Sequence, residues 1–298
     1  MSTFEIAAVG AALCWALSAI ISTAPSRTLG AFGFVRVRMA LVFVMLAVAA
    51  TATGGWSTLT ADMAVPILMS GFVGIFIGDT ALFSCMNRLG PRASGLLFAT
   101  NAPFAVLLAW LLLDETLVPQ ALAGGALTVI GVALAIVYGR PRRDETSWLE
   151  RVEGPLAIGV AVGLVAGLAQ ALGTLLARPV MVAGADPIAV SALRVAVAAL
   201  ALQAAASGGW KAARLAAPLD WRLVWQVAVS GLVAMGIGMT LLLYALEGGK
   251  VGIVSTLSAT TPVLVLPMLW LASGVRPGSA AWLGAAVTVV GAGLIFLR

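Results

Sequence analysis

Long apolar stretches recur along the whole sequence and leave little choice of fold. Each is about as long as the 20 residues that an α-helix needs to cross the hydrocarbon core of a bilayer. Charged residues make up only 10% of the chain, against about 25% in a soluble domain, so the chain cannot cover a water-facing surface. We therefore predict an all-α integral membrane protein with ten transmembrane helices. The predicted spans are residues 4–24, 32–53, 63–85, 93–113, 119–138, 155–177, 187–206, 223–246, 251–272 and 279–297.

One phrase of the sequence occurs twice. Residues 70–80 read SGFVGIFIGDT and residues 230–240 read SGLVAMGIGMT, an offset of 160 with six identical positions out of eleven. A second pattern, glycine and glycine with a threonine between them, recurs at the same offset. Two matches at one offset indicate a duplicated chain rather than the chance likeness of Gly-rich helices. The second pattern comprises Gly124, Thr128 and Gly131, then Gly284, Thr288 and Gly291.

The duplication divides the chain into two repeats of five helices. We predict a first repeat at residues 1–139, a polar linker at 140–153 and a second repeat at 154–298. Because five is an odd number, the second repeat enters the membrane in the opposite direction, which makes the repeats inverted. Inverted repeats with a binding site between them near the midplane are a recurring plan of secondary transporters.

The basic residues predict the orientation of the chain. Eleven of them lie in the loops after spans 1, 3, 5, 7 and 9, whereas the opposite side holds Arg178, Lys250 and Arg298. Since basic loops stay in the cytoplasm, both termini are expected on the non-cytoplasmic side of the cell inner membrane. The first apolar stretch begins with Glu5 and not with basic residues, so we interpret it as a retained span and not as a signal peptide.

The composition also excludes several kinds of site. The chain has no histidine and two cysteines, Cys14 and Cys85, both within apolar stretches. A histidine base, a histidine metal ligand and a disulfide framework are thereby excluded, and no motif indicates a metal or another cofactor. An intramembrane enzyme is therefore not expected. The net charge of +5 is explained by membrane orientation and does not indicate nucleic-acid binding.

Several features in a fixed order resemble the ten-helix drug/metabolite transporter superfamily of the EamA type, over essentially the whole chain. The resemblance implies a carrier of amino acids or other metabolites, similar to the bacterial aromatic amino-acid exporters, whose relatives are described with cytoplasmic termini. The sequence departs from the pattern where Ser273-Gly274 stands in place of an acidic pair. The features are Leu13-Cys14-Trp15-Ala16, Arg38 and Arg194 early in spans 2 and 7, Pro103 and Pro262 in spans 4 and 9, Leu113-Asp114-Glu115, and the glycines of spans 5 and 10.

Asp79 is the acidic residue placed deepest in a predicted span, and its repeat partner is Met239. A carboxylate inside a membrane is costly and usually faces a cavity or a partner. Asp79 could be protonated and bonded to a neighbouring helix, could bind and release a proton, or could pair with a substrate ammonium.

The remaining candidate residues gather on spans 1, 4, 6 and 9. Pro103 and Pro262 should interrupt their helices, and irregular backbone at membrane depth is tolerated beside protein or a water-filled cavity. The alternative is a kink satisfied by local Ser and Thr side chains. Arg38 and Arg194 either extend to the headgroups or recognise a carboxylate. The substrate-binding candidates are Trp15, Ser18, Asp79, Asn101, Gln170, Ser255, Ser258 and Thr261.

These observations predict a secondary transporter that exports amino acids, aromatic or of broad specificity, or similar small metabolites by alternating access. A facilitative uniporter, or an exporter of other metabolites or drugs, would have the same sequence pattern and remains the alternative. The expected partners are a small-molecule substrate and the lipid bilayer. The sequence leaves monomer and dimer open.

Overall fold

The computed structural model describes residues 2–113, 118–139, 148–248, 257–258 and 260–296. Ser255 and the acidic pair Asp114 and Glu115 lie outside these ranges. Within them every regular element is helical. Seven helices are long and apolar enough to cross a membrane, and three shorter apolar helices, Asn101–Leu112, Thr261–Ser273 and Ser279–Ile295, accompany them. The predicted all-α fold with ten spans is confirmed.

The helices follow the predicted spans closely. Each repeat contributes five spans, and the third span of each is assembled from several consecutive helical segments. In the first repeat the elements are α1 (Thr3–Leu29), α2 (Ala31–Thr53), α3 (Ala64–Ser70), η3 (Gly71–Ile77), α4 (Gly78–Phe98), α5 (Asn101–Leu113) and α6 (Pro119–Val137). After η5 (Trp148–Glu150), the second repeat contains α7 (Leu156–Val182), α8 (Pro187–Ser207), α9 (Trp221–Gly231), η7 (Leu232–Gly238), α10 (Met239–Gly248), α12 (Thr261–Ser273) and α13 (Ser279–Phe296).

Short polar and glycine signals set the helix boundaries. Asp186 and Asp220 cap α8 and α9 by accepting hydrogen bonds from backbone N–H groups of the first turn, which those groups otherwise lack. Gly30 separates α1 from α2 with φ 75°, and Gly90 divides α4 with φ 82°. Residues other than glycine rarely adopt this backbone conformation. The loop predicted between spans 3 and 4 is thus reduced to a single turn at Gly90-Pro91.

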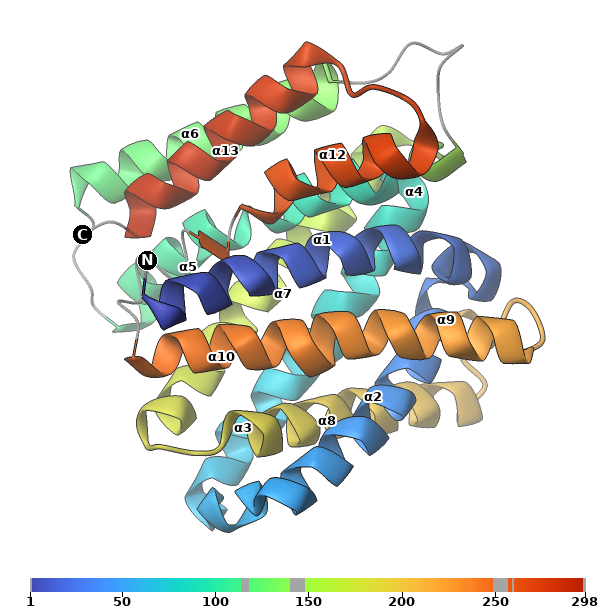
Figure 1. Ribbon diagram of the computed structural model, residues 1–298, viewed down its shortest axis with the longest axis vertical. Coiled ribbons are helices and arrows are strands. Elements are labelled where there is room, and N and C mark those ends of the chain that lie inside the picture. Colours follow the sequence, from blue (N-terminus) through green and yellow to red (C-terminus); the bar gives the residue numbers. More distant parts are fainter. Residues whose placement is uncertain (1, 114–117, 140–147, 249–256, 259, 297–298) are drawn as a thin grey trace.

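The two repeats interlock. Helix α1 packs against α9, η7, α10 and α12 of the second repeat, and α7 packs in the equivalent way against α3, η3, α4 and α5 of the first. Helices α2 and α8 cross each other, and α6 lies beside α13 at one edge of the molecule (Figure 1). The start of α1 and the end of α13 lie at the same end of the molecule. Each helix of one repeat therefore finds its main partners in the other repeat, as inverted repeats allow.

The repeated spacing of glycines in spans 5 and 10 brings α6 and α13 into backbone contact. A Cβ atom on Gly124 would lie 2.6 Å from the carbonyl oxygen of Gly291, and one on Gly131 would meet Thr288. Thr128 and Thr288 are fully buried, and each donates a hydrogen bond to the carbonyl four residues earlier in its own helix. Small residues of this kind let membrane helices approach closely.

The duplicated phrase forms a π-helix in both repeats. Segments η3 and η7 each contain seven residues and occupy equivalent positions between α-helical segments. Wider π turns are rare and are frequently found at functional sites. Around them the glycines allow close approach, since a Cβ on Gly71 would lie 2.6 Å from the carbonyl oxygen of Arg194 and one on Gly231 would meet Val42 and Arg38. The sequence did not predict this helix type.

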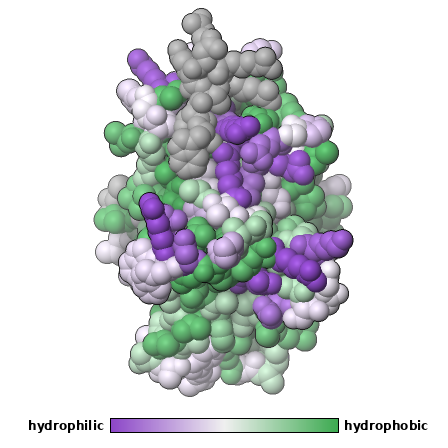
Figure 2. All heavy atoms as spheres, turned by 90° about the vertical axis from the view of Figure 1, so that its right-hand side faces the viewer, coloured by the Kyte–Doolittle hydropathy of each residue, from purple (hydrophilic) through white to green (hydrophobic). Residues whose placement is uncertain are grey.

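Hydrophilic side chains gather at the end of the molecule opposite the two termini (Figure 2). There the described part of the linker packs onto the helix ends. Arg92 forms a buried ion pair with Glu150 at 2.6 Å, and Arg27 donates hydrogen bonds to the carbonyls of Leu149 and Arg151. The residues after 147 thus form part of this surface.

Candidate functional site

Three charged side chains lie buried where the repeats meet. Asp79 lies in the first turn of α4, Arg38 lies on α2 and Arg194 lies on α8, with exposed fractions of 5%, 2% and 3%. Nη1 of Arg38 is 3.6 Å from Oδ2 of Asp79, and Arg194 is within electrostatic reach of the same carboxylate. We call Arg38, Asp79 and Arg194 the charged cluster. It contains two guanidinium groups for one carboxylate.

Arg38 is held from several sides. Its Nη2 donates a hydrogen bond of 3.5 Å to the carbonyl of Ser230. Its guanidinium also lies over the rings of Phe83 and Phe34, at 5.0 and 5.8 Å from their centroids, where the negative face of the ring attracts a cation. The position of Arg38 is therefore fixed by the first repeat and by one carbonyl of the second.

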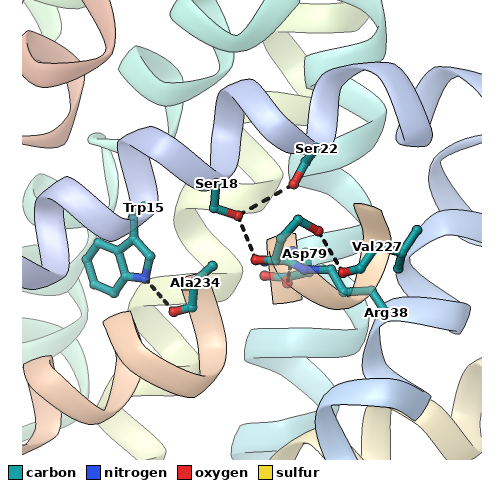
Figure 3. Close-up of polar contacts among 8 residues, drawn as sticks. Trp15, Ser18, Ser22, Arg38, Asp79, Val227 and Ala234 are labelled. Carbon is teal, nitrogen blue, oxygen red and sulfur yellow. Dashed lines mark hydrogen bonds and ion pairs between the residues drawn. The ribbon is translucent and has the colours of Figure 1, made fainter. Parts of the chain in front are cut away.

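Helix α1 reaches the same region through two predicted site residues (Figure 3). Ser18 Oγ donates to the carbonyl of Ser230 at 2.9 Å, and Trp15 Nε1 donates to the carbonyl of Ala234 at 3.1 Å. Both acceptors belong to the duplicated phrase of the second repeat. Where the duplicated phrase of the first repeat meets α7, the direction is reversed, since Ser70 Oγ of the phrase donates to the carbonyl of Gly173 on α7 at 2.6 Å.

Several polar atoms around the charged cluster are buried without a hydrogen-bond partner among the described residues. A buried donor or acceptor without a partner is costly, so their concentration in one region marks it as a site for a ligand or for a change of conformation. These atoms are Arg38 Nε, Asp79 Oδ2, Thr80 Oγ1, Ser191 Oγ and Arg194 Nε.

A narrow gap adjoins the charged cluster on the side of the second repeat. Arg194 and Ser191 supply its polar wall, and Ile75, Met235 and Met239 are among its apolar lining. In this conformation the gap is too narrow for a water molecule. The centre of the molecule is therefore closed around the charged cluster.

The predicted interruptions of spans 4 and 9 are present, and both follow one plan. Helix α5 begins at Asn101 and α12 at Thr261, so the helix starts have the 160-residue offset of the duplicated phrase. Pro103 and Pro262 both lie in the first turn, where a helix needs no N–H donor. They therefore begin the second helical segment instead of kinking a continuous helix.

Local side chains satisfy the backbone at these interruptions. Thr100 and Thr260 donate to the carbonyls of Leu97 and Leu257, three residues earlier. Asn101 does the same to Phe98, and Thr261 to Ser258. These contacts agree with the interpretation of a locally satisfied break. Asn101, Ser258 and Thr261 are half-buried.

The structure brings some predicted site residues together and leaves others apart. Trp15 and Ser18 of α1 contact the duplicated phrase of the second repeat. Asp79 belongs to the phrase of the first repeat, next to Gly78, which lies beside the backbone of the half-buried Gln170 on α7. Asn101, Ser258 and Thr261 lie instead at the breaks of spans 4 and 9. Extension of Arg38 and Arg194 to the headgroups is excluded because both side chains are buried in the protein.

One ion pair and one buried serine of this site were not predicted from the sequence. The pairing of Arg38 with Asp79 was not expected, although intramembrane charges of opposite sign commonly pair. Ser191, which is buried one helical turn from Arg194, was not among the predicted site residues.

A wider pocket lies away from the charged cluster, at the hydrophilic end of the molecule. Its volume is about 370 Å³, and Ser84, Asn87, Arg88 and Glu153 contribute to its lining. It lies between the start of α2, the part of α4 that precedes Gly90, and the end of the linker at Glu153. The concentration of buried, unpartnered polar atoms is at the charged cluster, so we take the cluster as the candidate site.

Comparison with known proteins identifies the family. A crystal structure of another protein has the same fold, with a TM-score of 0.71 and 19% sequence identity over 100% of this chain and 97% of that one. No curated protein matches the sequence. The model of the EamA-like transporter family matches residues 3–137 and again residues 157–297. With each repeat matched in turn, the chain belongs to the EamA-like transporter family and transports small molecules across a membrane.

Proposed function

We propose that this transporter exports amino acids or similar small metabolites across the inner membrane by alternating access. The observation that carries the proposal is the charged cluster, to which the first repeat contributes Arg38 and Asp79 and the second contributes Arg194. Charged side chains at membrane depth usually mark a substrate or proton pathway. Their position between inverted repeats is the position at which such transporters bind substrate.

The chemistry of the cluster suits a small solute that carries a carboxylate. A guanidinium binds a carboxylate through two parallel hydrogen bonds, and Asp79 can pair with an ammonium or carry a proton. Several phosphate groups would require more cations than the two arginines. The closed centre represents one of the states through which alternating access must pass, since the cluster cannot exchange with solvent while it is buried.

Counterflow in proteoliposomes tests the proposal. Vesicles containing the purified protein are loaded with one unlabelled solute, and uptake of the labelled solute is followed for amino acids, sugars and nucleotide sugars. We expect counterflow of amino acids and none of nucleotide sugars. Counterflow confined to sugars or nucleotide sugars would refute the proposed substrate class.

A second measurement separates an active exporter from a facilitator. The same vesicles are given a pH gradient, and accumulation of substrate against its own gradient is measured. Accumulation is expected if Asp79 couples proton movement to transport. Equilibration without accumulation at any pH gradient would identify a facilitative uniporter.

A further inference from the structure

The duplication places two arginines in equivalent positions but gives only one of them a carboxylate. Arg38 corresponds to Arg194, and Asp79 corresponds to Met239. In the first repeat, Arg38 and Asp79 are 3.6 Å apart. In the second repeat, Arg194 and Met239 line the same narrow gap. The second repeat therefore has the cation of the pair without its anion.

Two hydrogen-bond donors in this gap have no acceptor in the described part of the chain. Nε of Arg194 and Oγ of Ser191 are both buried and unpartnered, and each residue is 3% exposed. The two residues are three positions apart on α8, so their side chains lie on one face of the helix. The two oxygens of one carboxylate could accept from both donors.

The rest of the gap is apolar and comes from both repeats. Leu46 of α2 and Ile75 of η3 face Met235 of η7 and Met239 of α10. Methionine side chains are flexible and fill irregular space, so the gap can widen around an aliphatic group without loss of apolar contact. Both π-helical segments contribute to this wall, and a movement of either would change its width.

The charge of the cluster also favours an anion. When all three groups are ionised, Arg38 and Arg194 outnumber Asp79 by one positive charge. An uncompensated buried charge is costly. The carboxylate of a monoanion would balance it, whereas the ammonium of a zwitterion would restore the excess.

We propose that Arg194 and Ser191 bind the carboxylate of the transported solute, that its apolar body lies against Leu46, Ile75, Met235 and Met239, and that an ammonium group is not required. This inference rests on the proposed function and specifies the part of the solute that the site recognises. The ligand class is an aliphatic carboxylate with or without an α-amino group.

Three related probes separate the recognised groups. Leucine carries both charges, 4-methylpentanoate lacks the ammonium, and 3-methylbutylamine lacks the carboxylate. Binding is measured as ligand-induced thermal stabilisation of the purified protein in detergent. We expect leucine and 4-methylpentanoate to stabilise the protein and 3-methylbutylamine to have no effect. Stabilisation by the amine, or none by 4-methylpentanoate, overturns the inference.

Variants of α8 locate the carboxylate. Arg194→Gln should weaken 4-methylpentanoate binding by roughly tenfold or more, and Ser191→Ala by roughly twofold to tenfold. Ser94→Ala is the matched control, because Ser94 is a buried serine of α4 that donates to the carbonyl of Pro91. Unchanged affinity in both α8 variants would show that the carboxylate binds elsewhere.

Met239→Asp provides a test that does not remove the arginine. The new carboxylate would occupy in the second repeat the place that Asp79 has in the first, so Arg194 gains a partner and the protein should remain folded. We expect this variant to lose 4-methylpentanoate binding, while the control variant Ser94→Ala retains it. Binding retained by a folded Met239→Asp protein contradicts the inference.

The outcomes separate this inference from the proposed function. If leucine shows counterflow but 4-methylpentanoate neither binds nor inhibits it, the protein is an amino-acid transporter and the carboxylate inference is wrong. If 4-methylpentanoate binds through Arg194 and no amino acid shows counterflow, the inference stands and the proposed substrate class is wrong.

Discussion

Asp79 is the only member of the charged cluster that can exchange a proton near neutral pH, because guanidinium groups stay protonated. Asp79→Asn keeps the shape and the hydrogen-bonding capacity of the side chain but removes its charge and its proton. We expect the variant to lose accumulation driven by a pH gradient and to keep the exchange of substrate for substrate. Uptake into proteoliposomes under the two conditions measures both.

The result distinguishes the two roles of Asp79. Loss of exchange as well as accumulation would show that the carboxylate binds the substrate ammonium. Full activity in both assays would contradict either role and leave the carboxylate as a counter-charge for Arg38. Expression and thermal stability of the variant are measured alongside, because Arg38 loses the ion pair at 3.6 Å.

Individual site residues could be predicted from the sequence, but their contact partners could not. Asp79 stood out because its repeat partner Met239 is apolar. The pairing of Asp79 with Arg38 depends on the rotation of α4 and α2 about their axes, which apolar periodicity cannot fix in helices that are apolar all round. For the same reason Ser191 had no signal, since one serine in an apolar helix looks like any other.

At the scale of a helix, the start points of α5 and α12 are the best places to probe for an aqueous path. We predict that single cysteines at Asn101 and Thr261, in a background without Cys14 and Cys85, react with water-soluble maleimides and are protected by substrate. Both positions are half-buried in the closed conformation, so opening of the centre should increase their reaction. A cysteine at Thr128, which is fully buried, is the unreactive control. Failure of both test positions to react would place the path elsewhere.

The contact of α6 with α13 leaves no room for a side chain at its glycines. We predict that Gly124→Ala destabilises the protein by about 1–3 kcal/mol, the usual cost of overpacking, because the new Cβ would lie 2.6 Å from the carbonyl oxygen of Gly291. The neighbouring Gly125→Ala is the control, since its Cβ would meet Pro103 at an ordinary 3.5 Å. The midpoint of thermal unfolding in detergent should be lower for Gly124→Ala and unchanged for Gly125→Ala. Equal midpoints would show that the contact between α6 and α13 accommodates the added methyl group.

Helix boundaries were predictable where capping residues, glycines and prolines set them, as at Asp186, Gly30 and Pro262. The π-helical segments were not. A π turn has one more residue per hydrogen-bonded ring than an α turn, and η3 and η7 pack against helices of the opposite repeat. That packing is long-range, so no local pattern in the duplicated phrase could reveal it.

For the whole molecule, we predict that both termini lie outside the cytoplasm. The hydrophilic end that carries Arg27, Arg88 and Arg151 would then face the cytoplasm. Fusions of a fluorescent reporter and of a periplasmic phosphatase at Arg298 measure the side directly. Phosphatase activity without fluorescence is expected. Fluorescence without phosphatase activity would place the termini in the cytoplasm, as the resemblance to ten-helix relatives implied.

The whole fold could be predicted from the duplication, because an odd number of spans per repeat dictates inversion. Number and direction of the helices followed from apolar length and from the repeated phrase. The interlocking did not follow, since two inverted repeats could also stand side by side. Which helix faces which partner is decided by glycine contacts such as that of Gly71 with the backbone of Arg194.

The interlocking has a consequence for how the chain is made. Trp15 and Ser18 of α1 find their acceptors at Ala234 and Ser230, more than 200 residues later, so the first helix enters the bilayer long before its partners are synthesised. Until then, its polar groups must be satisfied by lipid headgroups, by water or by an insertion factor. A nascent chain that stalls before residue 230 would be a membrane-inserted but incomplete protein, and quality-control proteases could recognise it by those unsatisfied groups.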